Sequence, residues 1–121
     1  MATEARETAD LIGSDKVEGT TVYGAKGEKM GSIARVMIDK RSGQVAYAVL
    51  SFGGFLGIGS DYYPIPWASL KYDTSLGGYR LDITEGQLQG APKYAGESWD
   101  WEDRERGRKV YEYYGMPYLE Y

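Results

Sequence analysis

Three acidic residues, Asp100, Glu102 and Asp103, lie close together in the run Trp-Asp-Trp-Glu-Asp at residues 99–103. Paired carboxylates can transfer protons or bind a hard cation. The same pattern also places acids in the first turn of a helix, where the helix dipole favours negative charge. We expect the second role, and therefore neither a catalytic residue nor a metal site in this run.

A glycine-rich segment, residues 53–59, alternates glycine with Phe55, Leu56 and Ile58. A dinucleotide fingerprint needs Gly-x-Gly-x-x-Gly at the start of a helix, and a phosphate-binding loop ends in Gly-Lys-Ser/Thr. Neither pattern is present, and residues 60–67 read as a strand, so we expect a connection between strands. Its three large apolar side chains either fold back onto the core or form an exposed tip for contacts.

Histidine and cysteine are both absent from the 121 residues. Their absence removes disulfides, thiolate nucleophiles and imidazole bases, together with most zinc, copper and haem sites. The net charge of -4 and the isoelectric point of about 4.8 argue against sequence-independent binding to nucleic acid. We therefore expect no enzymatic activity, no cofactor and no nucleic-acid partner.

The N-terminal residues 1–16 are polar and resemble neither a secretory signal nor a membrane anchor. No segment reaches the roughly 18 apolar residues that a spanning helix needs. We expect a cytoplasmic protein without membrane insertion, whose residues 1–16 form a flexible arm. The alternative for this arm is that Leu11 and Ile12 dock on a neighbouring barrel or protomer.

From Val17 onward, short β-branched and aromatic segments alternate with glycine-containing turns, which predicts about six strands before residue 84. The run from residue 44 to residue 52 alternates strictly, so Ala46, Ala48, Leu50 and Phe52 should face inward. Tyr47 and Val49 should then cover a second surface or an interface. Pro64 and Pro66 remove backbone donors and predict an edge strand of irregular register.

Two helices should follow the strands. Thr84 and Gln87 fit a capping box, which predicts a short helix that ends near Gly90. Asp100 is expected to cap a second helix from Trp101 to Tyr114. Gly107 lowers the intrinsic stability of that helix by about as much as two ion pairs of i,i+4 spacing add, so packing has to hold the helix in place.

The C-terminal residues 95–121 are unusually aromatic. Tyrosine and tryptophan offer large contact areas with few torsions to freeze, so they either form an interface or cover the open end of their own barrel. Together with the glycine-rich segment, these side chains make up the candidate interaction residues: Phe55, Leu56, Ile58, Trp67, Trp99, Trp101, Tyr111, Tyr114 and Tyr118.

The order and spacing of several short segments resemble the PRC-barrel family over about residues 17–94. The resemblance rests on Gly19-Thr20, Val22-Tyr23, residues 27–31, residues 46–51, the glycine-rich segment, residues 64–67 and residues 88–94. It implies a small β-barrel like those of the photosynthetic reaction centre H subunit and of a ribosome maturation factor. It also implies a binding module for protein partners, with no catalytic residues to carry over.

We therefore expect a mainly β fold, a small six-stranded antiparallel β-barrel over residues 17–94, with a short helix after the last strand and a helical arm over residues 95–121. The expected function is a non-enzymatic adaptor that self-associates as a homodimer through strand edges or the aromatic arm. The alternative is a barrel that binds a small molecule or an ion, near Trp67 or at the carboxylates beside Trp101.

Overall fold

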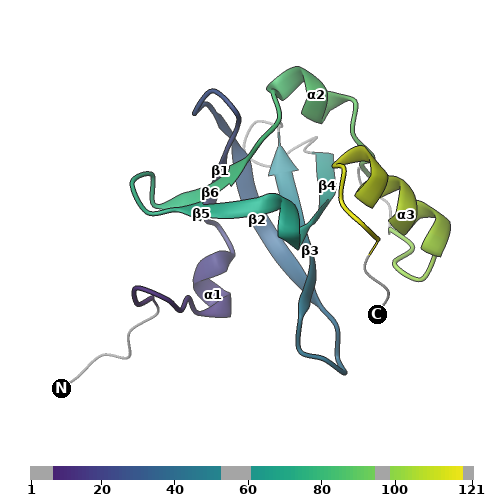
Figure 1. The fold of residues 1–121 in the computed structure, drawn as a ribbon, viewed down its shortest axis with the longest axis horizontal. Helices are drawn as coiled ribbons and strands as arrows, with labels where there is room; N and C mark the ends of the chain where they lie inside the picture. Colours follow the sequence, from purple (N-terminus) through teal and green to yellow (C-terminus); the bar gives the residue numbers. More distant parts are fainter. Residues whose placement is uncertain (1–6, 53–60, 95–98, 119–121) are drawn as a thin grey trace.

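The computed structural model describes residues 7–52, 61–94 and 99–118 (Figure 1). In chain order, the elements are α1 (Ser14–Val17), β1 (Thr21–Tyr23), β2 (Lys29–Ile38), β3 (Val45–Phe52), β4 (Asp61–Pro66), the 3-10 turn η1 (Trp67–Ser69), β5 (Leu70–Asp73), β6 (Gly78–Leu81), α2 (Glu85–Gln89) and α3 (Arg104–Tyr113). No helix of the described segments is long and apolar enough to cross a membrane.

The strands form one mixed sheet in the order β4-β3-β2-β1-β6-β5. The expected antiparallel barrel is wrong in two respects. Strand β1 pairs with β6 in parallel, with Val22 opposite Tyr79, and the sheet is an open half-barrel with β4 and β5 as its edges. Closure would require β4 to pair with β5, and Pro64 and Pro66 deprive β4 of backbone donors for such a pairing.

The proline-containing strand β4 lies at an edge, as predicted, but its register is regular. It pairs with β3 from Tyr47 opposite Pro66 to Phe52 opposite Asp61 without a shift. The irregularities occur elsewhere, between Val22 and Tyr23 of β1 and at two points of the β2–β3 pairing. The prolines fit a regular register because β4 needs donors only on the side that faces β3.

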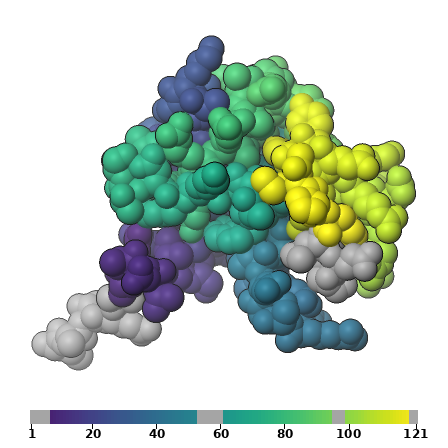
Figure 2. All heavy atoms as spheres, viewed as in Figure 1, coloured from purple at the N-terminus to yellow at the C-terminus, as the bar shows by residue number. Residues whose placement is uncertain are grey.

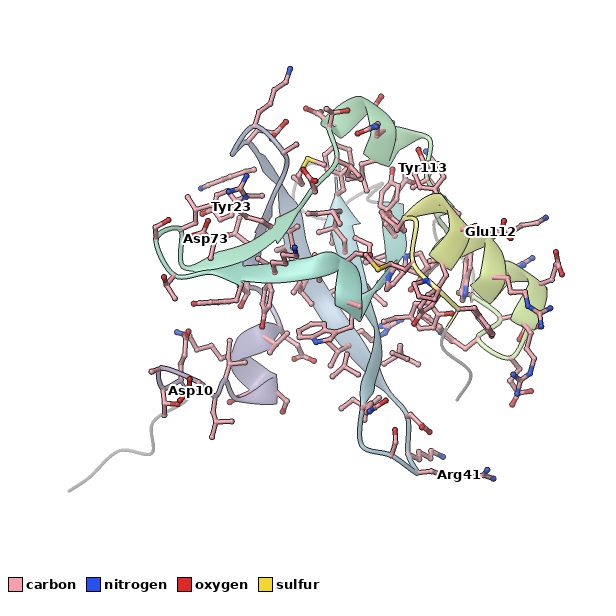
Figure 3. All side chains as sticks on the ribbon, in the orientation of Figure 1. Asp10, Tyr23, Arg41, Asp73, Glu112 and Tyr113 are labelled. Carbon is pink, nitrogen blue, oxygen red and sulfur yellow. The ribbon has the colours of Figure 1, made fainter. Side chains whose placement is uncertain are left out.

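Two hairpins connect neighbouring strands of the sheet. Strands β2 and β3 are joined by a turn in which Asp39 accepts hydrogen bonds from the Arg41 amide at 3.2 Å and from the Ser42 hydroxyl at 2.7 Å. This hairpin extends beyond the rest of the sheet, and Arg41 lies at its tip (Figures 1 and 3). The second hairpin joins β5 to β6, with Asp73 opposite Gly78.

The sheet buries apolar side chains on both faces. The concave face holds the barrel core, in which Ala48 and Leu50 of β3 pack with Ile65 and Leu81. A second cluster, the helix core, joins Ala46 and Tyr47 of β3 to α3. Ala46 departs from the predicted inward row because the β2–β3 pairing passes from Tyr47 directly to Val45, so Ala46 is the extra residue of a bulge.

The capping box of α2 is confirmed. The Gln87 amide donates to Thr84 Oγ1 at 3.2 Å, and the Thr84 amide donates to Gln87 Oε1 at 2.8 Å. Helix α3 begins at Arg104, later than predicted, and Asp103 rather than Asp100 is its cap. Asp100 instead accepts a hydrogen bond from the Glu102 amide at 3.1 Å, which fixes a turn before the helix.

The described part of the N-terminal segment folds against the sheet (Figure 1). Glu7 and Ile12 form an isolated bridge, and the Thr8 hydroxyl accepts hydrogen bonds from the Asp10 and Leu11 amides. Ile12 packs against the barrel core of its own chain, whereas Leu11 is 73% exposed. We call residues 7–12 the N-terminal loop.

Candidate interaction site

An apolar cleft of about 490 Å³, which we call the Trp67 cleft, opens between the sheet and the C-terminal segment. Its wall is formed by the start of β3, by η1, by one turn of α3 and by the residues after that helix. The lining residues are Gln44, Val45, Ala46, Trp67, Ala68, Tyr111, Met116 and Pro117. In the space-filling view, the C-terminal residues in yellow lie against the teal surface of the sheet (Figure 2).

Tyr111 is fixed at the floor of the Trp67 cleft. Its hydroxyl donates a hydrogen bond of 2.9 Å to the Ala46 carbonyl, and its ring meets the Tyr47 ring edge-on at a centroid distance of 5.4 Å. The Ala46 carbonyl is available because Ala46 lies at the bulge of β3. Tyr111 therefore ties α3 to the sheet and presents one side of its ring to the cleft.

Met116 reaches the cleft because the chain reverses after α3. Gly115 has a φ of 68°, the left-handed conformation that commonly ends a helix. The Met116 amide then donates to the Tyr111 carbonyl at 2.9 Å, which brings Met116 back over the last turn. Pro117 follows and cannot continue the helix. The reversal forms the outer wall of the cleft.

Trp67 also lines a second cleft of about 340 Å³, which we call the β5 cleft. This cleft lies between the N-terminal loop and the side chains of Trp67, Leu70, Tyr72 and Tyr79. The Trp67 and Tyr79 rings meet edge-on at 5.3 Å, so the indole is held between the two clefts. Trp67 thus contributes to both concave surfaces.

Acidic and phenolic groups set the charge of the β5 cleft. A hydrogen bond from the Tyr72 hydroxyl lowers the pKa of the Glu7 carboxyl, and Lys16 at 3.3 Å adds to this effect. The same hydrogen bond raises the pKa of Tyr72. Glu7 is therefore ionised at neutral pH. Its hydrogen bond with Tyr72 links the N-terminal loop to β5, and this contact is weak because it is exposed to solvent.

The predicted interaction residues fall into separate groups. Trp67 and Tyr111 meet at the Trp67 cleft. Trp99, Trp101 and Tyr118 pack on the helix core of the same chain, where Trp101 contacts the Tyr47 ring at 5.3 Å. Tyr114 is largely buried beneath α3 and contacts both cores. Phe55, Leu56 and Ile58 lie outside the described residues.

Two arginines of α3 also contact this aromatic group. The guanidinium of Arg106 lies 5.4 Å from the centroid of the Trp99 ring, and that of Arg108 lies 5.5 Å from the Tyr118 ring. Such contacts are attractive because the ring face carries negative charge density. They hold the aromatic residues of the arm against their own helix.

The carboxylates near Trp101 serve the local backbone. Asp103 accepts hydrogen bonds from the Glu105 and Arg106 amides at 3.0 and 3.2 Å. Asp100 fixes the preceding turn at Glu102. Within the described segments, no group of three or more acidic side chains converges in a way that could hold a metal ion. The helix-capping role expected for these acids therefore holds for Asp103, whereas Asp100 stabilises the turn that precedes the helix.

Sequence reasoning missed Met116 and Val45 as lining residues of the Trp67 cleft. Gly115 and Pro117 mark the end of the helix in the sequence. Helices that end in a left-handed glycine often place the next apolar residue back against their last turn, and this signal could have identified Met116. Val45 had no comparable signal, since only the fold brings the start of β3 beneath α3.

Comparison with known proteins identifies the folded region. The family described as PRC-barrel domain matches this chain over residues 9–88. No curated protein matches the chain significantly. The family match includes the N-terminal loop from residue 9, the whole sheet and most of α2, and it ends before α3. The Trp67 cleft is therefore built partly from the matched region and partly from the C-terminal segment.

Proposed function

This chain belongs to the PRC-barrel family, and we propose that it is a non-enzymatic protein-interaction module whose contact site is the Trp67 cleft. The observation that carries the proposal is the joining of Trp67, Tyr111 and Met116 in one open apolar cleft of about 490 Å³. Tryptophan, tyrosine and methionine are enriched at protein interfaces, where a few central side chains supply most of the binding energy.

The occupant that this cleft fits is an apolar side chain of another protein. Sites for polar metabolites place several hydrogen-bonding groups around the ligand. Here the Tyr111 hydroxyl already donates to the Ala46 carbonyl, and much of the remaining lining is aliphatic or aromatic. A large apolar anchor would bury this lining, and each Å² of apolar area removed from water contributes about 25 cal/mol.

The absence of cysteine supports a reducing compartment, and we propose that the partner is met in the cytoplasm. Self-association as a homodimer is the second form of this proposal. The aromatic arm packs largely on its own sheet, and β4 lacks outward donors, so we propose the Trp67 cleft or β5 as the surface for a homodimer. Light scattering at tens of micromolar distinguishes a monomer from a dimer.

Site-specific photocrosslinking in cells tests the proposal. A benzophenone amino acid is placed at Ala68, which is exposed on the wall of the cleft, and at Lys26, which is exposed in the β1–β2 turn, as a matched control. We expect a discrete protein adduct from position 68 that is absent from position 26 and lost in Trp67→Ala. Circular dichroism verifies that each variant is folded.

Each other outcome of this experiment has a defined meaning. An adduct with a second copy of the chain would identify homodimerisation as the interaction. Equal labelling at both positions, or labelling at position 68 that persists in Trp67→Ala, would contradict the proposed site. Since the adduct is identified by its mass and by its dependence on Trp67, the capture of an abundant bystander is excluded.

A second candidate function is the binding of an apolar small molecule, because the cleft volume lies within the roughly 300–1,000 Å³ typical of ligand pockets. A thermal-shift screen with quinones, flavins and fatty acids tests it, since a ligand of the folded state raises the melting temperature by mass action. The shift should disappear in Trp67→Ala. A shift that survives this substitution would assign the ligand to another site.

A further inference from the structure

The two edges of the open sheet differ in their capacity to accept another strand. At β4, the Tyr62 amide donates to the Tyr94 carbonyl at 2.8 Å, and the Tyr94 amide donates back at 2.9 Å. Successive residues of a strand turn their backbone groups to opposite sides. The backbone amide of Tyr62 points away from β3, so the backbone nitrogens of Pro64 and Pro66 point away from β3 as well. Neither proline nitrogen carries a hydrogen. The outer side of β4 therefore offers no free backbone donor.

Strand β5 carries none of these protections. It contains no proline, and within the described ranges it pairs only with β6. Leu70 and Tyr72 lie on one face of β5 and line the β5 cleft, and Tyr72 is 39% exposed. Exposed edges of this kind are the sites where extended peptides add to a sheet, with main-chain hydrogen bonds for affinity and neighbouring clefts for specificity.

The opposite face of the β5–β6 hairpin is basic. Lys71 lies directly across from Arg80, and both side chains are exposed. Like charges in such a position repel each other. Asp73 compensates Arg80 at 3.7 Å, whereas Lys71 has no carboxylate within 4.0 Å among the described residues. Acidic side chains on an added strand would reduce the repulsion between Lys71 and Arg80.

The β5 cleft itself is bordered by acids. Glu7 and Asp10 of the N-terminal loop line it beside Leu70 and Tyr72. Figure 3 shows Asp10 on the N-terminal loop, below the β5–β6 hairpin, in which Asp73 is the last residue of β5. An acidic side chain entering this cleft would be repelled, whereas an apolar one would cover the exposed part of the Tyr72 ring. The two faces of β5 therefore prefer different side chains.

We propose that the outer edge of β5 binds an extended segment of a partner protein in which apolar residues alternate with acidic ones. The apolar side chains enter the β5 cleft, and the acidic side chains lie beside Lys71 and Arg80. The chain as a whole is acidic, so the attraction is local and adds specificity rather than long-range steering. This docking surface shares Trp67 with the Trp67 cleft, but it does not include Tyr111 or Met116.

Nuclear magnetic resonance of the full 15N-labelled chain tests this surface. The probe is a blocked peptide of alternating valine and glutamate, and the control is the same peptide with lysine in place of glutamate. We expect amide shifts centred on residues 70–73 and on Arg80, and weaker binding of the lysine peptide. Lys71→Glu should lower the affinity for the glutamate peptide about threefold to tenfold and strengthen binding of the lysine peptide.

Several outcomes would overturn the proposal. Shifts centred on β4 or α3, equal affinities for the two peptides, or affinities unchanged by Lys71→Glu would each contradict it. A dependence of the β5 resonances on protein concentration without peptide would show that a second copy occupies the edge. Failure here leaves the photocrosslinking result at Ala68 unaffected, because the two experiments report on different residues.

Discussion

Gly107 of α3 lies against Tyr47 of β3, so closely that a Cβ built on Gly107 would stand 2.9 Å from the Tyr47 hydroxyl oxygen and 3.1 Å from the Tyr118 ring. Tyr47 cannot move away cheaply, because it is buried between the rings of Trp101 and Tyr111. The glycine that weakens the helix is thus the residue that lets α3 approach the sheet. The helix core depends on this approach.

Gly107→Ala should therefore destabilise the protein. Alanine would add up to about 1 kcal/mol of helix propensity, but overpacking against Tyr47 costs about 1–3 kcal/mol. We expect a net loss in the free energy of unfolding by urea. The matched control is Gly86→Ala in α2, where a Cβ meets only the Thr84 hydroxyl at 4.0 Å, and this variant should gain stability. Equal effects of the two substitutions would contradict the packing account.

Tyr111→Phe should cost about 1–2 kcal/mol, because it removes the 2.9 Å hydrogen bond and leaves the Ala46 carbonyl unpaired beneath α3. Urea unfolding monitored by fluorescence measures the loss. Tyr62→Phe is the control, since the Tyr62 ring stacks on Tyr94 at 5.5 Å and its backbone bridge does not involve the hydroxyl. A loss in the control as large as in Tyr111→Phe would argue against a specific role for the Tyr111 hydroxyl.

Tyr114→Phe should be neutral or stabilising at pH 7. The Tyr114 hydroxyl is buried without a hydrogen-bond partner among the described residues, and removal of such a group relieves a desolvation cost. Burial raises the pKa of Tyr114 well above its ordinary value. Because the folded state holds this proton more tightly, wild-type stability falls as the pH rises above about 10.

The alkaline loss in stability should therefore be smaller in Tyr114→Phe than in the wild type, as measured by urea unfolding at pH 7 and pH 11. Tyr113→Phe is the control, because the Tyr113 hydroxyl donates to the Gln87 carbonyl and its removal should destabilise. A loss of stability at pH 7 in Tyr114→Phe as large as that in Tyr113→Phe would contradict the prediction, because it would show that the Tyr114 hydroxyl has a hydrogen-bond partner.

Pro64→Thr should destabilise the protein. The Pro64 side chain is less than 2% exposed, so threonine would bury a hydroxyl and a backbone N–H on the outer side of β4, where proline has no donor. Urea unfolding measures the loss relative to wild type. Pro117→Thr, at an exposed position outside the sheet, is the matched control and should behave as wild type. Equal stability of the two variants would contradict this role of Pro64.

Much of the local structure could be predicted from the sequence. The capping box at Thr84, the turn at Asp39 and the edge position of the strand with Pro64 all follow from residues that lie close together along the chain. Their physical causes, a side-chain hydrogen bond or a missing N–H, act over a few positions. The order of residue types is sufficient for such features, and the PRC-barrel resemblance likewise rested on short segments.

The parallel pairing of β1 with β6, the open sheet and the Trp67 cleft were decided only by tertiary structure. Val22 and Tyr79 pair although they lie far apart in the sequence, and the Tyr111 hydroxyl donates to the Ala46 carbonyl because a bulge frees that carbonyl. The sequence alone left open whether the aromatic arm covers its own sheet or a partner, since burial of the same rings is favourable in both places. The arm packs on its own sheet because Gly107 lets α3 approach Tyr47 closely. Such a fit between surfaces forms only after segments that are distant in the sequence have packed together.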